Sequence, residues 1–254
     1  MVFFLELLKD PNRDRAGRVI LSGPVSTPLI ANQSNAPALA INNLKFTYSP
    51  VALAPVMAVD LPALTLGRGE QMLLSASSGA GKSTLLQLIA GLLDPTSGTV
   101  SVDGQVVHAL SADKRDAFRG RKIGMIFQTF NLLLGFTALE NVMAALLFST
   151  IPAREHAARA GSLLARLGID RPNAMAEDLS VGQQQRVAVA RAVACDPVLV
   201  LADEPTASLD PENAALAIEL IQSMCRERGA ALLCVSHDPS MASRFERRQT
   251  LTRG

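Results

Sequence analysis

The chain has 254 residues, of which 48% are apolar, so it is long enough to bury the core of one large domain or of two small ones. Lysine and arginine number 24 against 23 aspartates and glutamates, and a formal charge of +1 gives no electrostatic sign of nucleic-acid binding. No apolar run approaches the ~20 residues that a membrane-spanning helix needs. The three cysteines, Cys195, Cys225 and Cys234, lack metal-type spacing and are expected to be reduced thiols in the core.

The first 38 residues are predicted to be an extension that precedes a folded domain at 39–254. Residues 1–8 are apolar, but without a basic leader or a small-residue cleavage site they do not resemble a secretory signal. Residues 11–38 are rich in proline, serine and asparagine, which is typical of a loop or linker. We expect the extension to be partly disordered or to bind a partner.

The beginning of the domain is predicted to form a small antiparallel sheet. Residues 39–48 alternate loosely between apolar and polar side chains, as a strand does. A second strand is expected within 59–66, where Pro62 restricts it to a sheet edge or a strand start. Residues 99–107 predict a hairpin, because the Asp-Gly pair at 103–104 is a strong signal for a two-residue turn.

A phosphate-binding loop is predicted at residues 75–84, Ser-Ala-Ser-Ser-Gly-Ala-Gly-Lys-Ser-Thr. A short apolar strand precedes it and an apolar helical run follows, which is the context that this motif requires. The glycines let successive backbone N–H groups point at phosphate oxygens, and the start of the helix adds a partial positive charge. The residues expected to hold the nucleotide are Ser77, Ser78, Gly79, Ala80, Gly81, Lys82, Ser83 and Thr84.

Within this loop, Lys82 would supply a cation for the β- and γ-phosphates and Ser83 a hydroxyl ligand for Mg²⁺. The predicted ligands of the domain are therefore ATP and Mg²⁺. Ala76 stands where the general pattern has glycine. Because alanine disfavours positive φ, the first turn is expected to adopt a conformation that a Cβ allows.

Other polar side chains directly follow apolar runs that are predicted to be buried strands. The carboxyl ends of parallel strands share one edge of a sheet, so these side chains are expected to converge on the nucleotide. His108 and His156 lack this context and are expected on the surface. The converging residues are Gln128 after 123–127, Asp203 and Glu204 after 198–202, and His237 after 230–235.

These side chains have the chemistry of phosphoryl transfer, which is catalysed mainly by placement and charge stabilisation. Asp203 is the carboxylate that a magnesium nucleotide needs, and Glu204 could orient and deprotonate an attacking water. His237 could contact the γ-phosphate, and Gln128 could reach the metal or the water. The predicted catalytic residues are Glu204, His237, Gln128 and Lys82, and the predicted metal ligands are Ser83, Gln128 and Asp203.

Residues 179–192, Leu-Ser-Val-Gly-Gln-Gln-Gln-Arg-Val-Ala-Val-Ala-Arg-Ala, resemble the signature motif of ATP-binding cassette (ABC) proteins. The resemblance extends over 39–254, with the motifs in the family's order. It implies an α/β fold of the P-loop NTPase class, with a RecA-like parallel sheet, an N-terminal antiparallel β subdomain and an inserted α-helical subdomain at about 129–190. The other motifs are the phosphate loop, Gln128, the run 198–204, Ser-Leu-Asp at 208–210 and His237.

The resemblance also implies that two cassettes pack head to tail around two ATP molecules, as a homodimer. Ser180, Gly182 and Gln183 would then contact the γ-phosphate bound by the opposite cassette, and the start of a helix favours such an anion. Val181 stands where the family has glycine, and its β-branch narrows the backbone choices there. Tyr48, the only tyrosine, occupies the place of the family's adenine-stacking aromatic.

By the same resemblance, residues 128–142 would join the ATPase core to the helical subdomain and dock a transmembrane permease subunit. The exposed candidates there are Phe130, Leu132, Leu133 and Leu134. The protein would lie at the cytoplasmic face of the inner or plasma membrane, held through the permease. No nucleic-acid partner is expected.

Three kinds of cassette remain open: a transporter subunit, a soluble cassette that acts on ribosomes or DNA, and a degenerate cassette. Soluble cassettes usually carry two cassettes in one chain or a long coiled-coil insertion. This sequence has one set of motifs and no sustained heptads. Ala76 and Val181 suggest degeneracy, but Glu204 and His237 are intact. The sequence at 127–132, Phe-Gln-Thr-Phe-Asn-Leu, is most similar to the lipoprotein-release and macrolide-export group, with an amino-acid-type importer as the alternative.

Overall fold

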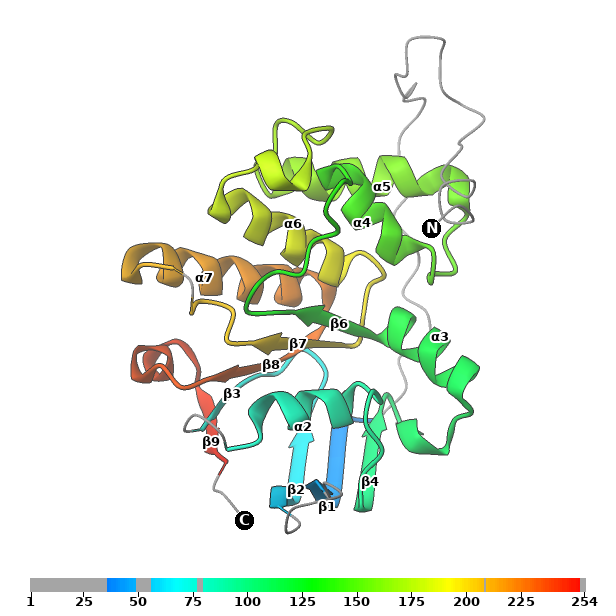
Figure 1. The fold of residues 1–254 in the computed structure, drawn as a ribbon, viewed down its shortest axis with the longest axis vertical. Helices are drawn as coiled ribbons and strands as arrows, with labels where there is room; N and C mark the ends of the chain where they lie inside the picture. The colour runs from blue at the N-terminus through cyan, green and yellow to red at the C-terminus, as the bar shows by residue number, and fades with distance from the viewer. Residues whose placement is uncertain (1–35, 49–55, 77–79, 208, 252–254) are drawn as a thin grey trace.

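A computed structural model describes residues 36–48, 56–76, 80–207 and 209–251. The predictions for residues 1–35, and those for Ser77, Ser78, Gly79 and Ser208, lie outside these ranges. The described chain forms a four-stranded antiparallel sheet of order β2-β1-β4-β5 and a five-stranded parallel sheet of order β6-β7-β8-β3-β9 (Figure 1). The strands are β1 Leu39–Tyr48, β2 Val56–Leu66, β3 Gln71–Ser75, β4 Ser97–Val102, β5 Gln105–Val106, β6 Ile123–Ile126, β7 Leu199–Asp203, β8 Ala231–Ser236 and β9 Arg247–Thr250.

The antiparallel sheet agrees with the prediction. Pro62, which cannot donate a ladder hydrogen bond, lies in β2 at the edge of this sheet. Asp103 and Gly104 join β4 to β5 with φ values of 52° and 78°, the left-handed pair that a type I′ hairpin turn requires.

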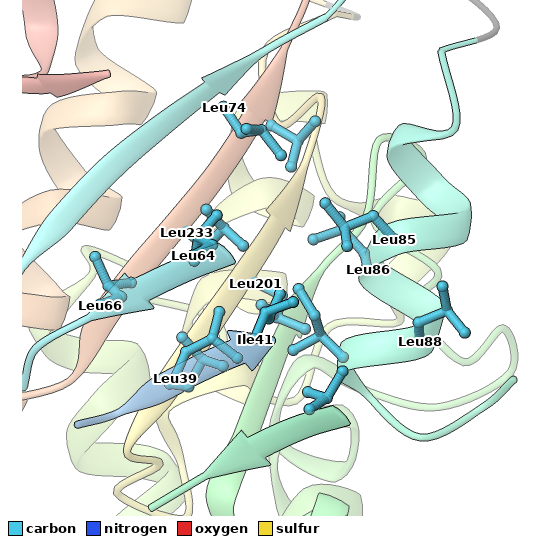
Figure 2. Close-up of a cluster of buried hydrophobic side chains, with 14 of the residues drawn as sticks. Leu39, Ile41, Leu64, Leu66, Leu74, Leu85, Leu86, Leu88, Leu201 and Leu233 are labelled. Carbon is cyan, nitrogen blue, oxygen red and sulfur yellow. The ribbon is translucent and has the colours of Figure 1, made fainter. Parts of the chain in front are cut away.

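Four strands of the parallel sheet, β6, β7, β8 and β3, are largely buried, and this explains why they are apolar runs, whereas edge strand β9 is polar and mostly exposed. Alternate residues of β7 point to opposite sides, so that Leu199 and Leu201 join one core cluster while Val200 and Ala202 join the other. Figure 2 shows the first cluster, in which Leu201 and side chains of β1, β2, β3 and β8 pack on one side of helix α2 (Lys82–Ile89). The second cluster fills the space between the sheet and helices α4 to α7.

Helices α4, α5 and α6 gather on the side of the parallel sheet that lies away from α2 and the antiparallel sheet (Figure 1). The predicted helical stretch 139–168 is two helices, α4 and α5. No helix in the described ranges has the length and hydropathy to cross a bilayer. The helices are α2 Lys82–Ile89, α3 Ala112–Lys122, α4 Ala138–Leu146, α5 Ala153–Arg166, α6 Val181–Val193 and α7 Pro211–Arg228, with short 3₁₀ helices η1 Val107–Ala109, η2 Ala176–Asp178 and η3 Pro239–Arg244.

Helix α7 begins and ends where the sequence predicts. The side chain of Asp210 accepts a hydrogen bond from the backbone N–H of Asn213, and Pro211 is in the first turn. Gly229 ends the helix with a φ of 64°. The local rules for helix ends therefore hold at both ends of α7.

The expected surface position of two histidines is wrong. His156 is only 6% exposed, and its Nε2 lies 2.8 Å from the carbonyl oxygen of Ile151. The side chain of His108 is 11% exposed, and its Nε2 lies 3.0 Å from the carbonyl oxygen of Leu88. An imidazole can be buried when a backbone carbonyl pairs with it, and the sequence does not show which carbonyls are available.

The prediction that the three cysteines are thiols in the core holds for two of them and partly for the third. Cys225 and Cys234 are buried, whereas Cys195 is only partly covered and donates its Sγ–H to the carbonyl of Ala145. Burial raises the pKa of the Cys195 thiol to about 11, so the protonated thiol prevails at neutral pH.

The central strand offers a test of the packing. Leu201→Ala in β7 should lower the free energy of unfolding by about 2–5 kcal/mol, because it leaves a cavity between fully buried side chains. Leu216→Ala on α7 is the matched control, since Leu216 is 60% exposed and its loss should change that free energy by about 0.5 kcal/mol or less. Urea denaturation measures both. Equal losses for the two variants would contradict this description of the core.

Candidate nucleotide site

An open pocket of about 510 Å³ lies at the carboxyl ends of the parallel strands. It brings together side chains from the antiparallel sheet, the start of α2 and the residues that follow β6, β7 and β8. This is the convergence that the sequence predicts for one edge of a parallel sheet. The predicted residues that line the pocket are Tyr48, Gly81, Lys82, Ser83, Thr84, Gln128, Asp203, Glu204 and His237.

The described end of the phosphate loop leads directly into α2. Gly81 has a φ of 82°, and a Cβ there would lie 1.9 Å from the carbonyl oxygen of Ala58, so only glycine fits. Ala76 is not among the residues with positive φ, as expected, and it is 5% exposed in the first core cluster. Its carbonyl accepts a hydrogen bond of 3.0 Å from the Nζ of Lys82. Alanine at position 76 is therefore compatible with its own backbone conformation and packing.

Glu204 is the most constrained group of the pocket. Its backbone adopts a φ of 46°, and its N–H donates to the carbonyl of Val235 at 2.9 Å. A left-handed conformation is uncommon for a residue with a Cβ, and such strain concentrates at functional sites. The carboxylate lies 3.2 Å from the Nζ of Lys82, and both side chains are about 10% exposed or less.

The carboxylate of Glu204 also accepts hydrogen bonds from the end of β8. Its Oε1 lies 2.6 Å from the Nδ1 of His237, the backbone N–H of His237 donates to the same carboxylate, and the Oγ–H of Ser236 donates to Oε2 at 2.9 Å. Burial raises the pKa of Glu204, but the donors on His237, Ser236 and Lys82 outweigh burial and hold it below its ordinary value. Glu204 is therefore ionised at neutral pH, as a base or a water-orienting group must be.

Ser236 is a member of this network that the sequence analysis did not single out. It is 1% exposed and also accepts a hydrogen bond from the N–H of Asp238 at 3.1 Å. The available signal was a hydroxyl at the end of an otherwise apolar strand, directly before His237. Such a residue has to find a partner when it is buried.

Asp203 and Ser83 form the oxygen-rich side of the pocket. The hydroxyl of Ser83 hydrogen bonds to the carboxylate of Asp203. Burial raises the pKa of Asp203, and the neighbouring charge of Glu204 adds to the increase, while Ser83 and Lys82 oppose it. A half-buried carboxylate next to a hydroxyl suits a hard divalent cation such as Mg²⁺, and the exposed amide of Gln128 lines the same pocket.

Tyr48 lies at the rim, with 44% of the residue exposed. Its hydroxyl is 3.2 Å from the Oγ1 of Thr84, and its ring packs edge-on against Phe46 at a centroid distance of 4.8 Å. These contacts hold the ring while leaving apolar surface that could stack on a flat base.

The signature residues lie outside the described lining of this pocket, at the N-terminus of α6. Ser180 and Gln183 form a reciprocal capping box, with the side chain of each residue accepting from the backbone N–H of the other. A Cβ at Gly182 would meet no atom within 4 Å, and Val181 is 51% exposed. This helix start therefore presents an open surface, but not to the pocket of its own chain.

One expectation for the segment 128–142 is wrong. Phe130 is 6% exposed, whereas Leu133 and Leu134 are 38% and 76% exposed and Leu132 packs partly against the second core cluster. Apolarity alone does not distinguish these residues. The backbone adopts a left-handed conformation at Phe130, where φ is 60°, and the side chain of this residue is buried.

Comparison with known proteins identifies the family. Residues 60–207 match the family model described as ABC transporter. The lipoprotein-releasing system ATP-binding protein LolD 1 of Caulobacter vibrioides is 47% identical over 194 residues, which cover 75% of this chain and 82% of LolD 1. The chain belongs to the ABC transporter family.

Solved cassettes share the fold of this ABC protein. The ATP-binding cassette MJ0796, solved as a dimer in a post-hydrolysis state with ADP and phosphate, matches with a TM-score of 0.75 and 35% identity over 85% of this chain and 95% of MJ0796. CbiO1 of Clostridium perfringens, part of the transporter complex cbiONQ, matches with a TM-score of 0.70 and 28% identity over 80% of each chain. The predicted α/β fold of a P-loop NTPase is confirmed, and the chain is an ABC ATPase cassette.

The network around Glu204 predicts a shift in pH dependence. Removing the hydroxyl donor in Ser236→Ala should raise the pKa of Glu204, whose pKa is lowered partly by that donor. Because activity that needs the ionised carboxylate is lost as pH falls through this pKa, the acidic limb of the ATPase profile should move to higher pH.

Ser243→Ala is the matched control, because Ser243 is exposed in η3 and its hydroxyl donates to the carbonyl of Ser240. ATP turnover of the three proteins is measured across the acidic range. Superimposable acidic limbs for Ser236→Ala and the wild type would mean that Ser236 does not tune Glu204.

Proposed function

We propose that this protein is the ATP-hydrolysing subunit of a membrane ABC transporter of the lipoprotein-release type. The observation that carries the proposal is the buried carboxylate of Glu204, kept ionised between Lys82 and His237 beside the phosphate loop. The name of the Caulobacter relative supports the transporter type. The same arrangement argues against a degenerate cassette, since Glu204 lies within hydrogen-bond distance of both Lys82 and His237.

In this proposal, Lys82 and the first N–H groups of α2 bind the phosphates of ATP, and Tyr48 stacks on the base. Mg²⁺, held by Ser83, Asp203 and Gln128, would neutralise charge on the β- and γ-phosphates. Glu204 orients the attacking water and accepts its proton. The ring of His237, fixed through Nδ1, faces the pocket with 59% of its side chain exposed and contacts the γ-phosphate.

We infer that residues 39–254 form one ATPase domain, with the helical subdomain at about 129–190, and that two copies pack as a homodimer. The N-terminus of α6 supplies the surface for the opposite pocket. The Oγ of Ser180 accepts from the N–H of Gln183, so its own O–H can still donate to a phosphate of the other copy. The dimeric form in which MJ0796 was solved supports this arrangement.

The permease is expected to dock near residues 128–142 at the cytoplasmic face of the inner or plasma membrane. Leu133 and Leu134 are the exposed apolar side chains of this segment. A pair of exposed leucines on a loop that follows the pocket residue Gln128 would give the permease an apolar contact close to the site of hydrolysis.

Replacing the base tests the mechanism. Glu204→Gln should bind ATP but hydrolyse it about 10²-fold more slowly or worse, because an amide cannot accept the proton. It should also accumulate as a dimer in the presence of ATP. Glu219→Gln, at an exposed position of α7, is the matched control and should behave as the wild type. Phosphate release and size-exclusion chromatography measure the two effects, and unchanged turnover would remove Glu204 from the mechanism.

Co-purification from native membranes tests the transporter assignment. When native membranes are solubilised in mild detergent, the tagged chain should co-purify with a multi-spanning protein. A large extracytoplasmic domain on that protein would favour the release type over an importer. Leu134→Asp should reduce recovery of this partner, because it places a charge in the proposed apolar contact. Leu216→Asp, at another exposed leucine, should not. Recovery only with ribosomes, DNA or the soluble fraction would contradict the proposal.

A further inference from the structure

Helix α6 contacts two functional segments that lie on different parts of the chain. In its middle, the buried side chain of Gln185 donates from Nε2 to the carbonyl of Pro205 at 3.0 Å, one residue after Glu204. In its last turn, the two terminal nitrogens of Arg191 donate to the carbonyls of Phe130 and Asn131, each at 2.6 Å. One helix therefore joins the segment after the catalytic carboxylate to the loop after Gln128.

The loop contacted by Arg191 has an unusual backbone. Phe130 and Asn131 have φ values of 60° and 47°, so two consecutive residues with a Cβ adopt the left-handed conformation. Such residues visit this region singly far more often than in pairs. The planar guanidinium offers two parallel donors, and here they donate to both carbonyls of the turn. Burial lowers the pKa of Arg191, as expected for a cation enclosed by this contact.

A second side chain holds the far end of the same loop. Asn141 of α4 is fully buried, and its Nδ2 donates to the carbonyls of Leu133, Phe136 and Thr137, while its Oδ1 accepts from the N–H of Leu133. The exposed Leu133-Leu134 pair thus follows the anchor at 130–131, and Asn141 holds Leu133 itself through its backbone N–H and carbonyl. A loop held at both ends moves with the helices that hold it.

We propose that Arg191 is a positioning residue that makes the loop at 130–134 follow helix α6. The inference rests on the proposed function, in which this loop docks the permease and the N-terminus of α6 contacts ATP of a second copy. A rotation or shift of α6 on nucleotide binding would pass through Arg191 to Leu133 and Leu134. Arg191 would thereby couple the ATP sites to the permease without touching either ligand.

The experiment compares Arg191→Gln and Arg191→Lys with Arg186→Gln. Arg186 is the matched control, because it lies on the same helix and also donates to a backbone carbonyl, that of Leu167, but not to this loop. Two quantities are measured on the full chain: hydrogen exchange of amides in 128–137, and ATP turnover of the isolated cassette and of the complex co-purified with its permease.

In Arg191→Gln, amide exchange in 128–137 should become faster, while the KM for ATP of the isolated cassette stays within about twofold. The second quantity is the ratio of ATP turnover in the complex to ATP turnover of the isolated cassette. In Arg191→Gln this ratio should be closer to one than in the wild type, by about fivefold or more. Arg191→Lys keeps the cation but not the fork, so it should be intermediate and covers the case in which Arg191→Gln folds poorly. Arg186→Gln should leave both quantities unchanged.

Unchanged exchange in 128–137, or a wild-type turnover ratio in both Arg191 variants, would overturn the inference. So would an equal effect of Arg186→Gln, since the loss would then reflect general weakening of α6. Failure of the wild-type chain to recover a permease would count against the proposed function instead. In that case the hydrogen-exchange comparison on the isolated cassette still decides whether Arg191 holds the loop.

Discussion

The nucleotide site depends on one constraint, that the charge of Glu204 is buried and must be paired. A carboxylate removed from water is costly unless cations and hydrogen-bond donors compensate it. Lys82 comes from the start of α2, and Ser236 and His237 come from the end of β8. The pairing therefore requires three elements to meet at one point, and their meeting creates the pocket.

The two core clusters make that meeting possible. Because β7 and β8 are covered on both faces, the alternating side chains of each strand pack into both clusters and leave the strand little freedom to shift. The first cluster packs α2 against the antiparallel sheet (Figure 2). That sheet carries Tyr48, which lines the pocket. The described part of the site is thus positioned by the ends of buried strands and by the start of a helix.

Helix α6 extends this organisation toward the helical side of the molecule (Figure 1). Its N-terminus is capped by a capping box, its middle contacts the segment after Glu204, and its end contacts the loop after Gln128. The sequence marks the first of these features as a motif. The other two contacts join residues 20 and 61 positions apart, and nothing local in the sequence indicates them.

The sequence by itself determined strands β1 to β8, the ends of α7 and the predicted residues that line the pocket, because each depends on neighbours along the chain or on the shared edge of parallel strands. Only the tertiary structure decided that Ser236 and Arg191 hold other functional groups, and that Phe130 and His156 are buried. The physical reason is the same in each case. Burial and hydrogen bonding depend on which backbone carbonyls and side chains arrive from distant segments, and an apolar or polar residue type does not specify its partner.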